Sequence, residues 1–310
     1  MLQRVITVAL NAYREAVRAR ILLGLVGVAF AVALYSLVVG AFTLNDAPRV
    51  VADLGCMAIS VFSITVAILI GATALHRELE QKTILPLLAR PIRRGEYLTG
   101  KYLGTMLVVA VFVMAEGGAV LMMSAGMGGR SIRQVLVLTA LLVGGLGVVA
   151  WRVPRARTFG PIFWAAIVMV VGIVLCADVP AERSLILASA ALTLCEVAII
   201  AAIATFFSSF STPFLSALLT IWMVVIGRSA DSMARMPVKV FGQTAKDVFG
   251  AMATVVPNLH VYVPSRTLLT GEAPDANLMS YLGMAFVQSL GWTVGLLAVA
   301  AFIFRRRDFL

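Results

Sequence analysis

One segment of the chain matches the beginning of a phosphate-binding loop. Residues Gly95-Glu96-Tyr97-Leu98-Thr99-Gly100-Lys101 have the G-x-x-x-x-G-K spacing, in which backbone amides and a lysine hold nucleotide phosphates. The next residue is Tyr102, whereas the magnesium ligand of such a loop is a Ser or Thr hydroxyl. The loop also needs a preceding strand, and here a basic turn precedes and an apolar run follows. We therefore interpret Gly100 and Lys101 as the inner end of a membrane-spanning helix, with Gly100 and Gly104 permitting close packing.

Two acidic residues, Glu116 and Glu196, lie inside long apolar runs and are candidate intramembrane polar sites. An ionised carboxylate in hydrocarbon is costly unless it is paired. Neither glutamate has a basic residue nearby in its own run. Two interpretations stay open: a protonated side chain hydrogen-bonded to a neighbouring helix, or a group on a substrate or proton path.

Other signatures of catalysis are missing from the sequence. It contains neither H-E-x-x-H nor G-x-S-x-G. Cys56, Cys176 and Cys195 are scattered singly, and His76 and His260 are the only histidines. Because no metal-ligand set can be assembled at motif spacing, we expect no metal site and no catalysis by this chain alone.

The elements that carry these residues are apolar runs of membrane-spanning length. Of the 310 residues, 61% are hydrophobic and 13% are charged, about half the charged fraction of a soluble domain. A bilayer core about 30 Å thick needs roughly 20 apolar residues per helix, which predicts an all-α polytopic bundle of about eight transmembrane helices. The expected spans lie in residues 21–75 (two), 102–129 (one), 134–177 (two), 184–228 (two, broken at 208–213) and 280–304 (one).

The positions of the basic residues predict the orientation. A net charge of +10 suggests nucleic acid in a soluble protein, but in a membrane protein the short cytoplasmic segments retain Lys and Arg. The short outer loops hold four such residues, Arg49, Arg130, Arg133 and Arg183, and the remaining five lie in or beside the long segment from Arg228 to Asn277. The inner segments hold sixteen: Arg4, Arg14, Arg18, Arg20, Arg77, Lys82, Arg90, Arg93, Arg94, Lys101, Arg152, Arg155, Arg157, Arg305, Arg306 and Arg307. We expect a multi-pass inner-membrane protein with both termini in the cytoplasm and no nucleic-acid partner.

Three segments outside the spans have patterns of their own. Residues 1–20 place apolar residues at helical spacing between arginines, which predicts an amphipathic helix on the inner membrane surface; the alternative is a solvated helix before the first span. Residues 76–101 form the most highly charged stretch and are expected in the cytoplasm. In residues 229–279 we expect short extracytoplasmic helices, interfacial or re-entrant.

The charged stretch carries a family resemblance. From Arg77 to Lys101 it presents an acidic cluster, a Thr followed by apolar residues, a Pro, basic residues and a Gly-Lys pair before the next span. This order resembles the cytoplasmic signature of permease subunits of type-2 ATP-binding-cassette exporters. The amphipathic helix of residues 1–20, the Ser-Ser-Phe-Ser-Thr-Pro turn at 208–213 and the ending from Phe304 to Phe309 are similar to the same family. Two features depart from it: Lys82 stands where Gly is frequent, and residues 134–177 look like a hairpin inserted into a six-span pattern.

The resemblance implies a single permease domain over residues 1–310 that lacks its own ATPase. Two copies, as a homodimer, would each meet a cytoplasmic ATP-binding subunit, which binds the ATP and magnesium. The implied docking residues are Glu78, Glu80, Lys82, Thr83, Leu87, Leu88, Arg90, Pro91, Arg93, Arg94 and Glu96. Two other classes stay open: a membrane scaffold that transports nothing, and a secondary transporter driven by protons through Glu116 or Glu196. The sequence does not indicate the substrate.

Overall fold

The structure is a computed structural model that describes residues 2–43, 46–74, 93–153, 156–235, 250, 256–270 and 277–306. The described part is all-helical and contains no strand, as expected. Its α-helices are α1 (Leu2–Val17), α2 (Arg20–Ala41), α3 (Ala47–Thr73), α6 (Arg94–Met127), α7 (Ile132–Arg152), α8 (Ala156–Leu175), α9 (Pro180–Ser208), α10 (Pro213–Ala234), α13 (Arg266–Thr270) and α14 (Leu278–Arg306). Two 3-10 turns, η1 (Cys176–Asp178) and η2 (His260–Tyr262), complete it.

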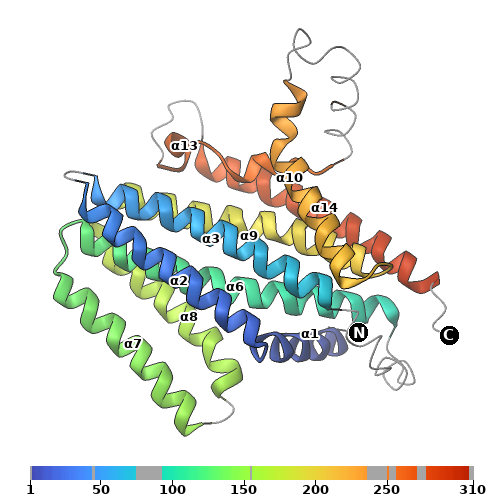
Figure 1. Cartoon of the computed structure of the whole chain (residues 1–310), viewed down its shortest axis with the longest axis horizontal. Coiled ribbons are helices and arrows are strands. Elements are labelled where there is room, and N and C mark those ends of the chain that lie inside the picture. Colours follow the sequence, from blue (N-terminus) through green and yellow to red (C-terminus); the bar gives the residue numbers. More distant parts are fainter. Residues whose placement is uncertain are drawn as a thin grey trace.

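Seven of the described helices are long and apolar enough to cross a membrane, namely α2, α3, α6, α8, α9, α10 and α14. The expected eighth span forms α7, whose described apolar part, Arg133–Val149, is shorter than the other seven. The whole of α7 has 21 residues. At 1.5 Å per residue it is about 31 Å long, close to the thickness of a bilayer core. It lies beside α8, so the pair forms the hairpin that the sequence suggested (Figure 1).

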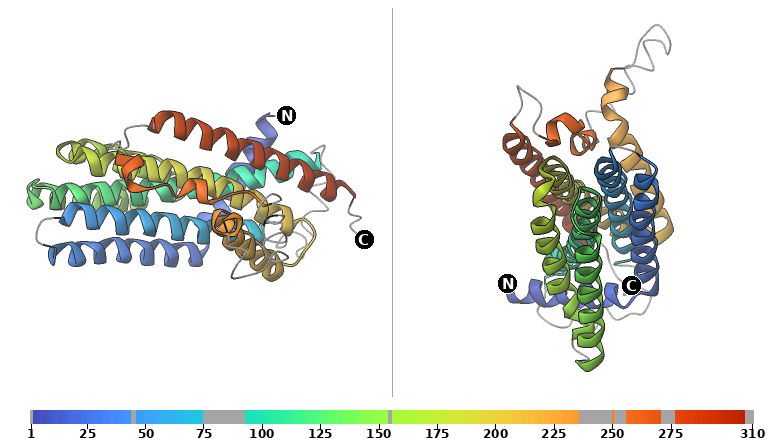
Figure 2. Two further views of the ribbon diagram at one scale, coloured as in Figure 1. Left: turned by 90° about the horizontal axis from the view of Figure 1, so that it is seen from above. Right: turned by 90° about the vertical axis from the view of Figure 1, so that its left-hand side faces the viewer.

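The spans lie side by side, and α1 crosses them near one end (Figure 2). We call this the α1 end. The first turns of α6 lie there as well, since α6 packs against α1. The last turn of α14 lies beside them, because Arg94 of α6 is hydrogen-bonded to the backbone of Phe304. Much of the apolar face of α1 is buried, with Val5, Val8 and Tyr13 among its covered residues, whereas Leu2 and Ile6 are exposed. The amphipathic helix predicted for the amino-terminal segment is therefore confirmed, and much of its apolar face covers protein.

Close packing around α6 holds the bundle together. This helix contacts α1, α3, α8, α9 and α14. A Cβ at Gly104 would lie 2.5 Å from the Cβ of Ala12 and 2.7 Å from the carbonyl oxygen of Ala9, so only glycine allows α1 to approach this closely. On the other side, a Cβ at Gly118 would lie 2.6 Å from the backbone of Val168 in α8. The close approach expected near the start of the third span is confirmed.

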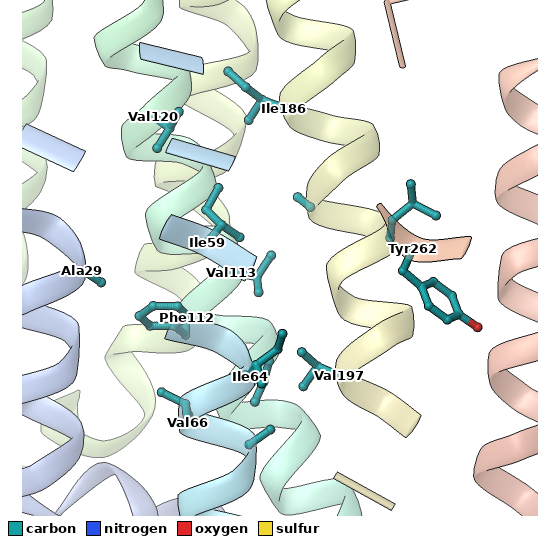
Figure 3. Close-up of a cluster of buried hydrophobic side chains, with 14 of the residues drawn as sticks. Ala29, Ile59, Ile64, Val66, Phe112, Val113, Val120, Ile186, Val197 and Tyr262 are labelled. Carbon is teal, nitrogen blue, oxygen red and sulfur yellow. The ribbon is translucent and has the colours of Figure 1, made fainter. Parts of the chain in front are cut away.

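Branched aliphatic side chains fill the space between α3, α6 and α9 (Figure 3). Ile59, Val113, Val120, Ile186 and Val197 are fully buried there or nearly so. Such close-packed interiors resist changes of even one methylene, so the spacing between these three helices is tightly determined.

Two helix boundaries differ from the expected ones. Helix α6 begins at Arg94, before the expected start at Tyr102, and its 34 residues give a length of about 51 Å. Because this exceeds the hydrocarbon thickness, the helix extends beyond the bilayer core. Helix α10 continues to Ala234, past the expected end at Arg228. The predicted turn is confirmed, since α9 ends at Ser208 and α10 begins at Pro213.

We predict that Gly104→Ala destabilises the protein whereas Gly145→Ala does not. The added methyl at position 104 overlaps α1, and overpacking of this kind costs about 1–3 kcal/mol of unfolding free energy. Gly145 in α7 has nothing within 4 Å of an added Cβ, so the same substitution there is neutral or slightly stabilising. Thermal unfolding in detergent measures both. Equal melting temperatures for the two variants would contradict the tight α1 contact.

Candidate functional site

The first turn of α6 is fastened to the last turn of α14 at the α1 end. Arg94 Nη1 donates hydrogen bonds to the carbonyl oxygens of Phe304 and Arg305, each at 3.1 Å. Carbonyls at a helix C-terminus lack intrahelical partners and carry partial negative charge, so a cation is favourable there. The Glu96 carboxylate accepts a hydrogen bond at 3.2 Å from the backbone N–H of Arg93, which caps the beginning of α6.

The same residues line a hollow between α6 and α14. Its volume is about 1030 Å³, and Arg93, Arg94, Glu96 and Arg305 are among its lining residues. The structure thus brings three of the predicted docking residues together at the α1 end. The other eight, Glu78, Glu80, Lys82, Thr83, Leu87, Leu88, Arg90 and Pro91, lie outside the described residues.

An ion pair joins α1 to α6 close to this hollow. Lys101 Nζ lies 3.2 Å from Glu15 Oε2, and the Lys101 side chain is almost fully buried. The segment 95–101, which has phosphate-loop spacing, lies entirely within α6. Its backbone follows a helix instead of a phosphate-binding loop, in agreement with its interpretation as the end of a membrane-spanning helix.

Glu196 is half of an ion pair in the middle of the bundle. Its side chain in α9 is 1% exposed. Arg228 of α10 donates from Nε to Glu196 Oε1 at 2.7 Å and from Nη2 to Oε2 at 2.9 Å, and Nη2 also reaches Ser60 Oγ in α3 at 2.7 Å. The sequence indicated no counter-charge for Glu196, and the structure corrects this. The expected span ended at Arg228, whereas α10 continues for almost two more turns and places Arg228 against Glu196.

Glu116 in α6 has a different environment. The side chain is fully buried, and neither carboxylate oxygen has a hydrogen-bond partner among the described residues. The hydrogen bond to a neighbouring helix that we expected is therefore not found in the described part of the chain. A buried carboxyl without a counter-charge is far less costly in its neutral form.

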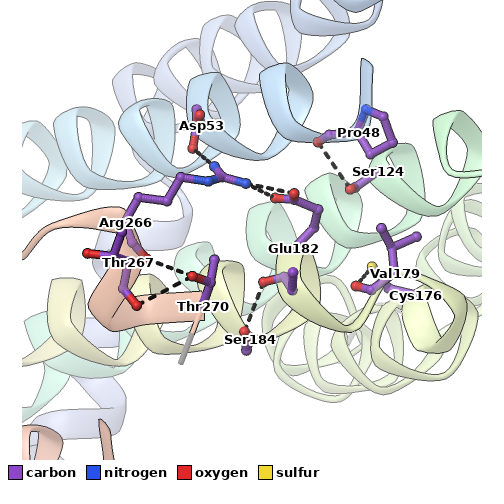
Figure 4. Close-up of polar contacts among 11 residues, drawn as sticks. Pro48, Asp53, Ser124, Cys176, Val179, Glu182, Ser184, Arg266, Thr267 and Thr270 are labelled. Carbon is purple, nitrogen blue, oxygen red and sulfur yellow. Dashed lines mark hydrogen bonds and ion pairs between the residues drawn. The ribbon is translucent and has the colours of Figure 1, made fainter. Parts of the chain in front are cut away.

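Arg266 of α13 fastens the segment after α10 to α3 and α9 (Figure 4), at the end of the bundle opposite α1 (Figure 1). Its Nη2 lies 2.6 Å from both carboxylate oxygens of Glu182 in α9, and its Nη1 is hydrogen-bonded to Asp53 in α3. Partial burial lowers the pKa of the guanidinium, but its bonds to Glu182 and Asp53 outweigh this, so the pKa lies above its ordinary value. This cluster was not found from the sequence, because its three members come from distant segments.

The same segment also contacts α10 and α14. The backbone N–H of Leu259 donates to the Gly227 carbonyl at 3.0 Å, and the Tyr262 hydroxyl donates to the Ala285 carbonyl at 3.3 Å. The two short helices in this segment, η2 and α13, have the form expected for residues 229–279 as far as they are described.

Seven apolar helices of spanning length, joined by ion pairs between helices, define a multi-pass integral membrane protein. A family model described as ABC-2 family transporter protein matches residues 6–309. The match covers nearly the whole chain, so this protein belongs to the ABC-2 transporter family and is a membrane permease component. No curated protein matches the sequence. The membrane domain of this family carries no ATP site of its own, and membership implies a partner ATPase.

We predict that breaking the Glu196–Arg228 pair costs more than removing it. Arg228→Gln leaves the buried Glu196 without its counter-charge, a change that typically loses about 3–5 kcal/mol. Combining it with Glu196→Gln should recover most of the lost unfolding free energy, because no charge is then left unpaired. Arg130→Gln is the control, since its pair with Asp178 is more exposed and contributes about 1 kcal/mol or less. Thermal unfolding in detergent compares the wild type, the two single variants Arg228→Gln and Glu196→Gln, the double variant and the control. Simple additivity of the two single changes in the double variant would show that the two side chains are not coupled.

Proposed function

We propose that this chain is the transmembrane subunit of an ATP-driven exporter, which moves its substrate across the cytoplasmic membrane with ATP hydrolysed by a separate subunit. The observation that carries the proposal is the family match over residues 6–309. The export direction rests on the resemblance of the segment from Arg77 to Lys101 to exporter permeases.

In this proposal the ATP-binding subunit docks at the α1 end, on the charged segment predicted from the sequence. Three of the docking residues support the location, because Arg93, Arg94 and Glu96 line one hollow there. Arg94 holds α14, and Lys101 holds α1 through Glu15. A displacement of this end would therefore move α1, α6 and α14 together, as a rigid-body transition requires.

Two copies of the chain pair in the proposed transporter, each with one ATP-binding subunit that holds ATP and magnesium. Both termini lie in the cytoplasm. The excess of basic residues in the inner segments supports this orientation, as does the common location of α1, the start of α6 and the end of α14.

A proton-driven transporter is the second candidate. The observation that favours it is the buried carboxyl of Glu116, which has no hydrogen-bond partner among the described residues. If the chain is an exporter subunit, we expect the Glu116→Gln variant to fold and to keep most of the wild-type transport activity. A Glu116→Gln variant that unfolds at the wild-type temperature but no longer transports would support the proton path.

We predict that Leu87→Ala combined with Leu88→Ala weakens association with the ATP-binding subunit while membrane insertion is unchanged. Apolar anchors in a charged rim carry most of the binding energy of an interface, so the pair should cost at least about 2 kcal/mol, or about 30-fold in affinity. Co-purification and ATPase stimulation in nanodiscs measure the effect.

A matched control is Leu136→Ala with Leu141→Ala, two leucines exposed on the surface of α7. Arg93→Glu should mainly slow association and change its salt dependence, because charges at a rim steer encounter. Wild-type association of the Leu87 and Leu88 variant would instead favour a membrane scaffold.

A further inference from the structure

An apolar cavity of about 120 Å³ lies between α1, α2, α3 and α6. Leu22, Leu25, Val66 and Ile70 line it, and the Lys101 ammonium at its wall is paired with Glu15. An apolar cavity of about 150 Å³ stays dry and binds benzene, so this one fits a short length of hydrocarbon better than water.

The mouth of the cavity opens on the surface that lipid covers. Ile21 and Leu69 are among its lining residues, and they are 67% and 37% exposed. Both belong to candidate spans, Ile21–Ala41 and Ala47–Thr73, and they lie towards the α1 end of those spans. An acyl chain of the surrounding bilayer can therefore reach the cavity from the side.

A polar hollow adjoins the cavity and shares Glu15 and Ala19 with it. Its volume is about 690 Å³, and its other lining residues are Asn11, Arg14 and Arg18. The Arg14 guanidinium lies 4.8 Å from the centroid of the Phe159 ring, a contact that restricts its position. Glu15 is the one acid in the lining, and Lys101 offsets its charge. The hollow is thus suited to an anion.

We propose that the two hollows together bind one anionic phospholipid, with its phosphate at Arg14 and Arg18 and part of one acyl chain in the cavity. The polar hollow and the apolar cavity follow one another as the headgroup layer and the hydrocarbon layer of a bilayer do. Helix α1, which bears the two arginines, crosses the ends of the spans, and the cavity lies between α1 and the spans α2 and α3 (Figure 2). Arginine is well suited to phosphate, which it can bind through two parallel hydrogen bonds. The bound lipid fills the space between α1 and these two spans. This inference rests on the membrane class of the protein and not on the proposed ATPase.

The test uses the full-length protein in detergent, with phosphatidylglycerol and phosphatidylcholine of identical acyl chains as probes in native mass spectrometry. We expect preferential retention of phosphatidylglycerol. Because each arginine near an anionic headgroup contributes about fivefold in affinity, Arg14→Gln with Arg18→Gln should lower that retention about 25-fold and leave phosphatidylcholine unchanged. Arg152→Gln is the matched charge control, since Arg152 is exposed at the end of α7 and lines neither hollow.

Two further measurements test the acyl part of the site. Ala19→Leu places a larger side chain where the two hollows meet, and it should weaken the binding of both lipids. Phosphatidylglycerol with a diazirine on its acyl chain should label Leu22, Leu25 or Val66 on irradiation. Labelling confined to other residues, or equal retention by the arginine variant and wild type, overturns the proposal. Competition by inorganic phosphate as strong as that by the lipid also overturns it, because the acyl chain would then contribute nothing.

Discussion

A charge inside this protein is stable only where another helix supplies its partner, and much of the arrangement of the bundle follows from that requirement. In hydrocarbon an unpaired ion is strongly unfavourable. The Glu196–Arg228 pair joins α9 to α10, and the bond from Arg228 to Ser60 adds α3. Nearer the α1 end, Lys101 joins α6 to α1. Each pair fixes the rotation of two helices about their own axes, because both charged groups must face each other. Glu116 stands apart, since among the described residues nothing pairs with it.

Close packing then converts these pairings into a connected framework. Helix α6 is fastened to α14 at its first turn, to α1 at Gly104, and to α8 at Gly118. Such contacts leave little free volume, so a displacement at one end cannot be absorbed locally. Since the family implies a partner ATPase, a long helix with neighbours fixed at both ends is a suitable element for transmitting such a displacement.

The hairpin of α7 and α8 is integrated into the bundle on one side only. A Cβ at Gly172 of α8 would lie 2.6 Å from the Gly118 carbonyl oxygen of α6, so the two backbones touch. Helix α7 in turn lies against α8 and is largely exposed on its remaining surface. The pair of α10 and α9 packs elsewhere in the bundle. Helices α7 and α8 therefore broaden the bundle without separating the helices that carry the Glu196–Arg228 ion pair.

The sequence by itself determined the all-helical class, most of the spans, the turn at 208–213 and the amphipathic first helix. These features depend on hydropathy, length and periodicity, which are local properties of the chain. The sequence also identified the family, through one charged segment. Only the tertiary structure decided which groups meet. Arg228 was placed at the very end of an expected span, and its pairing with Glu196 became visible once α10 was seen to continue past it. Arg266, Asp53 and Glu182 come together from three distant segments. A helical period tells which residues share a face, but the neighbour that covers that face is set by packing of the whole bundle.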